Sequence, residues 1–176
     1  MTDQTPKRPN FFAGKLLSAD DLALEQNYFL NKSKRHNRFL HGFGIVSGLH
    51  VDLSSGKIAV DPGLALDCEG NEIVLPVKQV LAVALIPDTA RYLNIGFEEK
   101  MDFVPGPGGE EQQQPAIIND SFALAFSAQN YNSNHRHSHG RWLVCGNLHP
   151  LTIAKLLRTS SGWHIDRRYR QPRVKA

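Results

Sequence analysis

The sequence predicts a mainly β protein of the α+β class: an antiparallel β-sandwich or partly closed barrel with one long N-terminal helix packed on it. Two observations predict this fold. Residues 18–41 have helical spacing and helix-end signals, whereas from residue 45 onward short apolar runs recur between turn signals. Turns about every 8 to 12 residues are typical of sandwiches and barrels. At 176 residues, we expect a single domain, residues 1–176.

The helix is predicted to begin at Ala19 and to end at about His41. Ser18 is a favourable N-cap, because its hydroxyl can accept a hydrogen bond from the backbone amide of Asp21. Gly42 follows the last helical residue and can adopt the left-handed conformation that often ends a helix.

This helix is unusually rich in hydrogen-bonding side chains, many of which we expect to be half buried beside apolar neighbours. We predict that they hold neighbouring loops in place, a structural role that explains the histidines better than catalysis does. This structural motif comprises Ser18, Asp21, Glu25, Gln26, His36, Asn37, Arg38, His41 and Gly42.

The remainder of the chain is predicted to form short strands separated by Gly, Ser, Pro and Asn turns. The expected strands are 45–53, 57–61, 64–67, 72–76, 80–86, 91–97, 121–128, 141–148, 153–158 and 163–167.

Two segments interrupt the strand pattern, and a third ends the chain. Residues 98–120 contain PGPGGEEQQQP, which predicts an exposed loop between two strands of the same domain. Residues 129–140 are polar and rich in histidine. Residues 167–176 form a basic tail that could dock on an acidic partner, through residues that include Arg167, Arg168 and Arg170.

The N-terminal motif resembles a segment found in proteins encoded among phage-tail-like genes, including contractile injection systems and tail fibre or baseplate components. The family pattern runs approximately N-[FY]-F-x-G-x-L-L-[ST]-x-x-D-[FL], then E-Q-x-Y, then R-H-N-R-x-L-H-G-x-G-[IV]-V-x-G-L-x-V. This chain matches it at residues 10–51, and a second block matches at residues 60–75. The resemblance implies a place in a tail-like assembly with other protein components.

The HxHxH run of His135, His137 and His139 is the one candidate metal site. In an extended chain these imidazoles lie on one side, but about 7 Å apart per step, too far for one ion to bind all three. Three chains around a three-fold axis could bring enough nitrogens together to bind iron or zinc. The alternative interpretation is a solvated, histidine-rich loop with no metal.

Composition excludes several other classes. The net charge is +3, but the basic clusters lack a nucleic-acid reader motif, so nucleic-acid binding is not expected. We find no membrane-length apolar run and no signal peptide, and therefore expect no membrane partner and cytoplasmic synthesis, with later assembly into a particle or release within one. We predict that Cys68 and Cys145 are buried thiols and not a disulfide.

We therefore predict a non-enzymatic structural and interaction component of a phage-tail-like particle: a baseplate, fibre or contractile injection system accessory protein. We expect it to be a homo-oligomer, with a trimer favoured. One alternative is a carbohydrate or cell-surface binding module of a tail fibre that uses Tyr131 and Trp163. Another is a metal-dependent enzyme that uses the histidine run.

Overall fold

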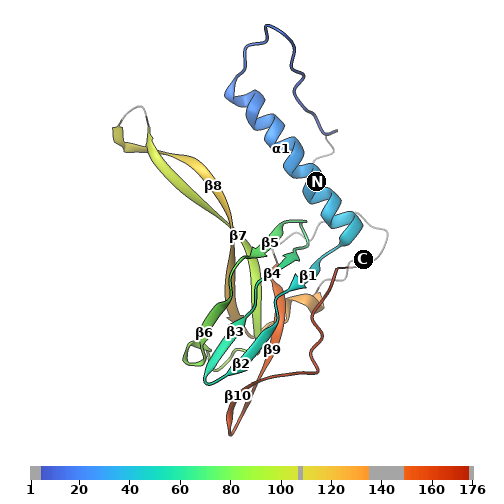
Figure 1. Cartoon of the computed structure of the whole chain (residues 1–176), viewed down its shortest axis with the longest axis vertical. Helices are drawn as coiled ribbons and strands as arrows, with labels where there is room; N and C mark the ends of the chain where they lie inside the picture. The colour runs from blue at the N-terminus through green and yellow to red at the C-terminus, as the bar shows by residue number, and fades with distance from the viewer. Residues whose placement is uncertain (1–4, 107–108, 135–148, 175–176) are drawn as a thin grey trace.

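A computed structural model describes residues 5–106, 109–134 and 149–174, excluding the side chains of residues 105–106, 109–115 and 134. A helix precedes ten β-strands, with short helical turns between some of them (Figure 1). The elements are α1 (Ala19–His36), the π-helical turn η1 (Asn37–His41), β1 (Gly44–Gly48), β2 (Val51–Ser54), β3 (Lys57–Val60), β4 (Gly63–Leu66), β5 (Glu72–Leu75), β6 (Gln79–Ala82), the 3₁₀ turn η2 (Val83–Leu85), β7 (Tyr92–Gly106), β8 (Gly109–Ser127), the 3₁₀ turn η3 (Tyr131–Asn134), β9 (Leu151–Thr159) and β10 (Gly162–Ile165).

The described strands form three sheets with antiparallel pairing throughout. Their orders are β1-β4-β5, β2-β3-β6 and β10-β9-β7-β8. The C-terminal segment adds one parallel bridge, between Arg173 and Ile45 of β1. Together the sheets form a compact β body, and the predicted mainly β fold with one N-terminal helix is confirmed.

One hydrophobic core joins the sheets of the body. Strand β5 shows how the sequence builds it: Ile73 and Leu75 are buried, whereas Glu72 and Val74 point to solvent. Such alternation follows from the two-residue repeat of a strand. The core is completed by similar side chains from the other sheets, including Ile45, Leu49, Ile58, Val60, Leu93, Ile95, Leu151, Ile153 and Leu156.

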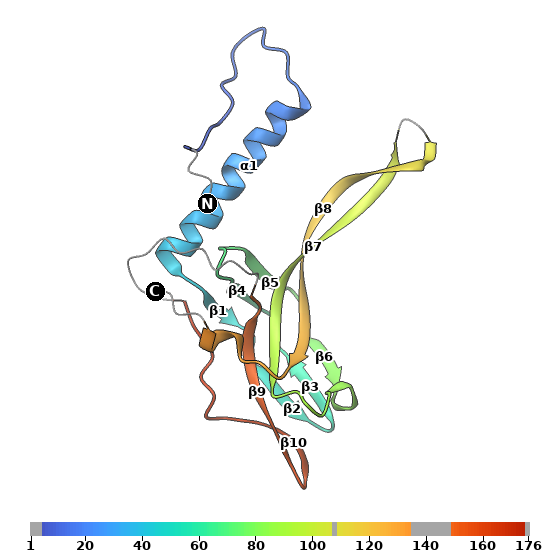
Figure 2. The ribbon, with the colours of Figure 1, turned by 180° about the vertical axis from the view of Figure 1, so that it is seen from behind.

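Two parts of the chain project from the β body (Figures 1 and 2). One is α1 with the segment that precedes it, and the other is the outer half of the β7–β8 hairpin. Both leave the same end of the body and diverge as they extend. We call the hairpin's outer half, residues 98–106 of β7 and 109–120 of β8, the arm.

The arm corrects the prediction of a loop over residues 98–120. Strand β7 continues to Gly106 and β8 begins at Gly109, so that nearly the whole segment is paired. The Pro, Gly and Gln residues that predicted a loop lie near the hairpin's turn, where backbone irregularity is tolerated. The segment is exposed, as expected, but its described backbone is a two-stranded ribbon.

Other predicted elements differ in smaller ways. The helix ends its regular part at His36 and continues as a π-helical turn to His41, and Gly42 follows with φ 74°. The predicted strand over 80–86 is interrupted by the 3₁₀ turn η2 (Val83–Leu85). The predicted strand over 141–148 lies outside the described residues.

Candidate assembly surfaces

Helix α1 exposes apolar side chains while burying none of its own residues. Leu22, Leu24, Phe29 and Leu30 are all exposed on it, and the preceding segment exposes Leu16 at 90%. Isolated helices of this length are marginally stable in water, because helices in proteins gain most of their stability from tertiary packing. The apolar residues of α1 are therefore suited to burial against another surface.

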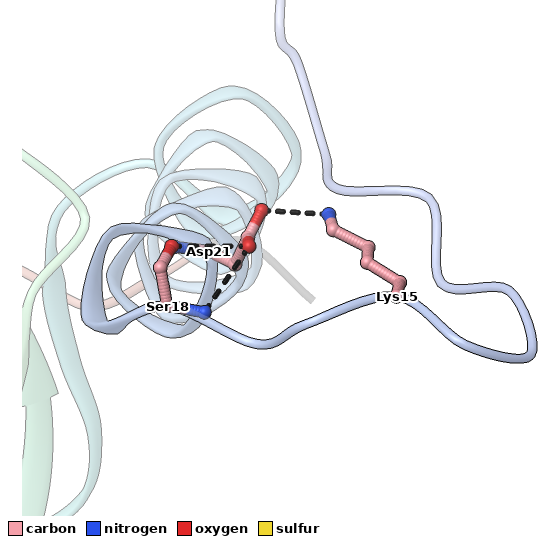
Figure 3. A network of polar contacts seen from close by, with 3 residues as sticks. All are labelled: Lys15, Ser18 and Asp21. Atoms are coloured by element: carbon pink, nitrogen blue, oxygen red, sulfur yellow. Dashed lines mark hydrogen bonds and ion pairs between the residues drawn. The ribbon is translucent and has the colours of Figure 1, made fainter.

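The start of α1 is fixed by a reciprocal capping box, as the sequence predicted (Figure 3). The Asp21 amide donates to the Ser18 hydroxyl at 3.1 Å, and the Ser18 amide donates to the Asp21 carboxylate at 3.3 Å. Lys15 forms an ion pair with the same carboxylate at 2.7 Å. The hydrogen bond from Lys15, together with those from Ser18, lowers the pKa of Asp21 below its ordinary value.

The other end of α1 is anchored to the β body through Asn37, the one buried residue of the π-helical turn. Its side-chain amide donates to the Gly70 carbonyl at 3.1 Å and to the Glu72 carboxylate at 3.2 Å. Gly70 has φ 88°, and a Cβ atom there would lie 2.0 Å from the carbonyl oxygen of Lys34. Gly70 is therefore required both by its backbone conformation and by the close approach of the helix.

A buried aspartate stabilises the turn that receives this helix. The Asp67 carboxylate accepts hydrogen bonds from the amides of Glu69 and Asn71 and from the Asn71 side chain, at 2.7 to 2.9 Å. Asp67 and Asn71 are both buried. The contact between α1 and the body therefore rests on an ordered turn.

The second projection, the arm, also exposes apolar side chains. Met101 pairs with Ile118 across the two strands, and Phe103 lies two residues beyond Met101 on the same strand. All three are exposed, as are Val104 and Ile117. An isolated two-stranded hairpin is marginally stable in water, so this surface is also suited to burial against a partner.

The two projections have opposite charge. Among the arm's described side chains, Glu98, Glu99, Asp102 and Asp120 outnumber the one basic residue, Lys100. The end of α1 near the body and the turn after it are basic instead, with Lys32, Lys34, Arg35 and Arg38. The cations suit the negative end of the helix dipole, as the sequence suggested.

The remaining polar residues of the predicted helix motif are not gathered into one site. Glu25 is half buried, whereas Gln26, His36 and His41 are exposed, and the rings of His36 and His41 lie 5.3 Å apart. The guanidinium of Arg38 stacks over the Phe39 ring at 4.6 Å. The expectation that many of these groups are half buried was therefore wrong for the exposed three. Their helix projects from the body.

The basic tail lies partly against β1. The Ile45 amide donates to the Pro172 carbonyl at 2.8 Å, and the Gln171 side chain donates to Leu49 and Ile153 carbonyls. The tail is thus held to the body as well as charged. Its candidate interaction residues remain exposed: Arg167, Arg168 and Arg170.

Tyr131 and Trp163, the aromatic candidates for glycan binding, lie apart from both projections and are only half exposed. The Tyr131 amide donates to the Thr152 hydroxyl at 3.0 Å, within a network that includes Asn94, Asn132 and Tyr169. Trp163 lies under the Arg158 guanidinium, 5.5 Å from its ring. Burial raises the pKa of Tyr169 within this network.

The proposed metal ligands His135, His137 and His139 lie outside the described residues, as does Cys145. Within the ranges that the structure describes, no group of three or more His, Cys, Asp or Glu side chains could hold a metal ion. Cys68 is buried near the helix junction. No helix in the described part of the chain is long and apolar enough to cross a membrane.

The arm's apolar face was missed by sequence reasoning. A short signal was present, because apolar and charged residues alternate over residues 100–103, Lys-Met-Asp-Phe, in the outer part of β7. The adjacent Pro- and Gly-rich segment indicated a loop instead, so this strand was not predicted.

The fold is similar to that of solved type VI secretion baseplate proteins. A chain of a baseplate complex matches with a TM-score of 0.57 and 14% identity, over 96% of this chain and 60% of that chain. A chain of a TssK-TssF-TssG baseplate subcomplex matches with a TM-score of 0.55 and 13% identity, over 96% and 62%. The crystal structure of TssK matches with a TM-score of 0.51 and 12% identity, over 92% and 41%.

The chain spans about three fifths of the matched chains in the two complexes and about two fifths of that in the TssK structure. No protein-family model matches the sequence, and no curated protein does. At these identities the likeness establishes the fold.

Proposed function

We propose that this protein is a non-enzymatic structural and interaction component of a phage-tail-like particle, and that it belongs to the particle's baseplate. Its task is to hold neighbouring components together through the α1 projection and the arm. We further propose that it works as a homo-oligomer, with a trimer as the favoured state.

The observation that carries this proposal is that α1 buries none of its residues while exposing four large apolar side chains. Surfaces of this kind on monomeric proteins mark interaction sites. The arm repeats the pattern on a second element, which supports a protein that contacts more than one neighbour.

Two independent likenesses support the tail-like context. The N-terminal motif resembles proteins encoded among phage-tail-like genes, and the fold is similar to that of type VI secretion baseplate chains. The first likeness rests on sequence and the second on structure, so they do not repeat one observation. Within the described residues, no specific feature favours glycan binding or metal-dependent catalysis instead.

The proposal is tested by asking whether the protein enters assembled particles. Particles are sedimented from cells that express a tagged copy, and each fraction is probed for the tag. We expect the wild-type protein in the particle fraction. A projection variant with Phe29→Ser and Met101→Ser should fold normally and be lost from it, because each change removes an exposed apolar contact.

A matched control carries Val74→Ser and Val80→Ser, which remove exposed apolar side chains from the β body. We expect this control to enter particles as the wild type does. A folded wild-type protein absent from every particle fraction would contradict the proposal, as would a projection variant that enters particles normally.

A further inference from the structure

We propose that the arm of one copy of this protein docks on α1 of a second copy, with the arm's acidic residues against the helix's basic residues. The inference deepens the proposed function, because it names a second copy of the chain as one partner of both projections. It rests on the charges, the apolar residues and their spacing along the two elements.

The arm has one face on which acidic and apolar residues follow each other. Glu99 pairs directly with Asp120, and Met101 pairs directly with Ile118. Because directly paired residues and residues two apart lie on the same face, all four share it, and Phe103 continues it. Like charges placed opposite each other destabilise a strand pair. Among the described residues, neither Glu99 nor Asp120 has a cationic partner, so a cation from elsewhere would relieve this repulsion.

Helix α1 offers a complementary face. Leu24, Tyr28 and Lys32 follow one another at four-residue spacing, and Arg35 lies seven residues after Tyr28, which places all four on one side. Leu24 and Lys32 are exposed, and Tyr28 and Arg35 are half buried. Neither Lys32 nor Arg35 forms an ion pair with another described residue. This face of the helix therefore has unpaired cations beside the exposed Leu24 and the half-buried Tyr28.

The two faces match in order and in length. Moving outward from the body, the arm presents Glu99, then Met101, then Phe103, at about 7 and 13 Å from Glu99 at 3.3 Å per strand residue. The helix presents Lys32, then Tyr28, then Leu24, at about 6 and 12 Å from Lys32 at 1.5 Å per helical residue. A parallel alignment of the two projections thus pairs charges near the bodies and apolar groups farther out.

A second copy fits these observations better than the same copy does. Within one copy the two projections diverge (Figures 1 and 2), and they extend in different directions. The side-chain ion pair and hydrogen bond of described arm residues lie within the arm, between Lys100 and Glu98 and between Asn119 and Asp102. Each copy also provides one arm and one helix, so a head-to-tail contact uses both surfaces in every copy. Such heterologous contacts form closed rings when the rotation between copies closes.

The test uses two charge-reversed variants of the full chain. The arm variant carries Glu99→Lys and Asp120→Lys, and the helix variant carries Lys32→Glu and Arg35→Glu. Each alone places like charges in the contact, so each should self-associate about tenfold or more weakly than the wild type. Light scattering and sedimentation over a concentration series measure this.

Mixing the two variants supplies the decisive result. The cationic arm of the first variant faces the anionic helix of the second, and the reciprocal contact has its native charges. An equimolar mixture should therefore associate more strongly than either variant alone. In a three-membered ring, two of the three contacts can join unlike variants, so the recovery is partial. A control variant carries both Asp52→Lys and Lys57→Glu, which reverse exposed charges on the β2–β3 hairpin of the body. It should self-associate as the wild type does.

Several outcomes would overturn the inference. These are a wild-type protein that stays monomeric at every concentration tested, reversals without effect, and a mixture that associates no better than its components. If both projections are protected from hydrogen exchange to the same degree at every protein concentration, the contact forms within a single copy. A monomer that still enters particles would overturn this inference and the proposed oligomeric state, but would leave the proposed structural role in the particle intact. Self-association without entry into particles would contradict that structural role alone.

Discussion

The two halves of strand β7 have similar apolar residues and opposite environments. Leu93 and Ile95, in the inner half, are 0% exposed, whereas Met101 and Phe103, in the outer half, are 49% and 53% exposed. The inner half lies between β8 and β9, and the outer half pairs with β8 alone. The difference arises from which elements cover the strand, because residues 93–95 and residues 101–103 have the same apolar-polar-apolar order.

This contrast separates residues that stabilise the fold from residues available to partners. The inner half contributes to the single core, where each side chain is enclosed by packed neighbours. The outer half and α1 expose large apolar residues at a distance from that core. Stability measurements on the isolated chain should therefore respond to the first set, and assembly measurements to the second.

The largest expected effect is from truncation in the inner half. Ile95→Ala should lower the free energy of unfolding by about 2 to 5 kcal/mol, because it removes fully buried methyl and methylene groups and leaves a cavity. Urea unfolding followed by circular dichroism measures this change.

The matched change in the outer half is Met101→Ala. In the dilute isolated protein it should alter the free energy of unfolding by less than about 0.5 kcal/mol, because the side chain is exposed. Equal losses from the two substitutions would show that the arm is part of the cooperative core, and the contrast between the two halves would fail.

An effect smaller than that of Ile95→Ala is expected at the junction between the helix and the body. Asn37→Ala removes the buried amide that donates to Gly70 and Glu72, and should cost about 1 to 3 kcal/mol of unfolding free energy. Asn31→Ala is the control, since the Asn31 side chain is exposed and bonds only within the helix, to the Asn27 carbonyl. Indistinguishable melting curves for the two variants would mean that Asn37 does not anchor α1.

The sequence predicts the elements of this fold better than their surroundings. The helix start could be predicted because Ser18 and Asp21 interact locally, and strands such as β5 followed from their alternation. The prediction of one strand over residues 45–53 was wrong, because the chain forms β1 and β2 there, in two different sheets. The arm could not be predicted from its composition. The Pro and Gly residues near the turn disfavour strands, but the pairing between residues 92–106 and 109–127 outweighs this tendency. The curvature of the chain around one core is likewise non-local.

For the candidate surfaces too, the sequence identifies residues better than it identifies their contacts and exposure. The sequence identified Asn37 as a structural residue, but its partner Gly70 is 33 residues away and no local pattern connects them. His36 and His41 were expected beside apolar neighbours, yet the helix projects and leaves them exposed. Whether a side chain on α1 is buried depends on where the helix points, which the π-helical turn and Gly42 determine.

A change at the cap of α1 is expected to have a weaker and more local effect on stability. Ser18→Ala removes the hydroxyl that accepts from the Asp21 amide and should cost the helix about 1 kcal/mol. Since this end of α1 lies far from the core, we expect faster hydrogen exchange in the first turn and an unchanged melting temperature of the body. A shift in the body's melting temperature would indicate that the projection unfolds together with the core.

The smallest expected effect is the pH dependence of the same cap, which comes from the charge of Asp21. The pKa of Asp21 is lowered chiefly by the hydrogen bond from Lys15 and then by those from Ser18. A carboxyl group whose pKa is lower in the folded state stabilises that state fully above the ordinary carboxyl pKa. This contribution is lost as pH falls through the lowered value.

Lys15→Ala should therefore raise the pKa of Asp21 towards its ordinary value and move the loss of first-turn helix to higher pH. Carboxyl-carbon NMR titration measures the pKa, and backbone amide chemical shifts of the first turn measure the loss of helix. Lys32→Ala, remote on the same helix, should leave the Asp21 titration unchanged. An Asp21 titration that does not respond to removal of Lys15 would show that the ion pair in Figure 3 does not persist in solution.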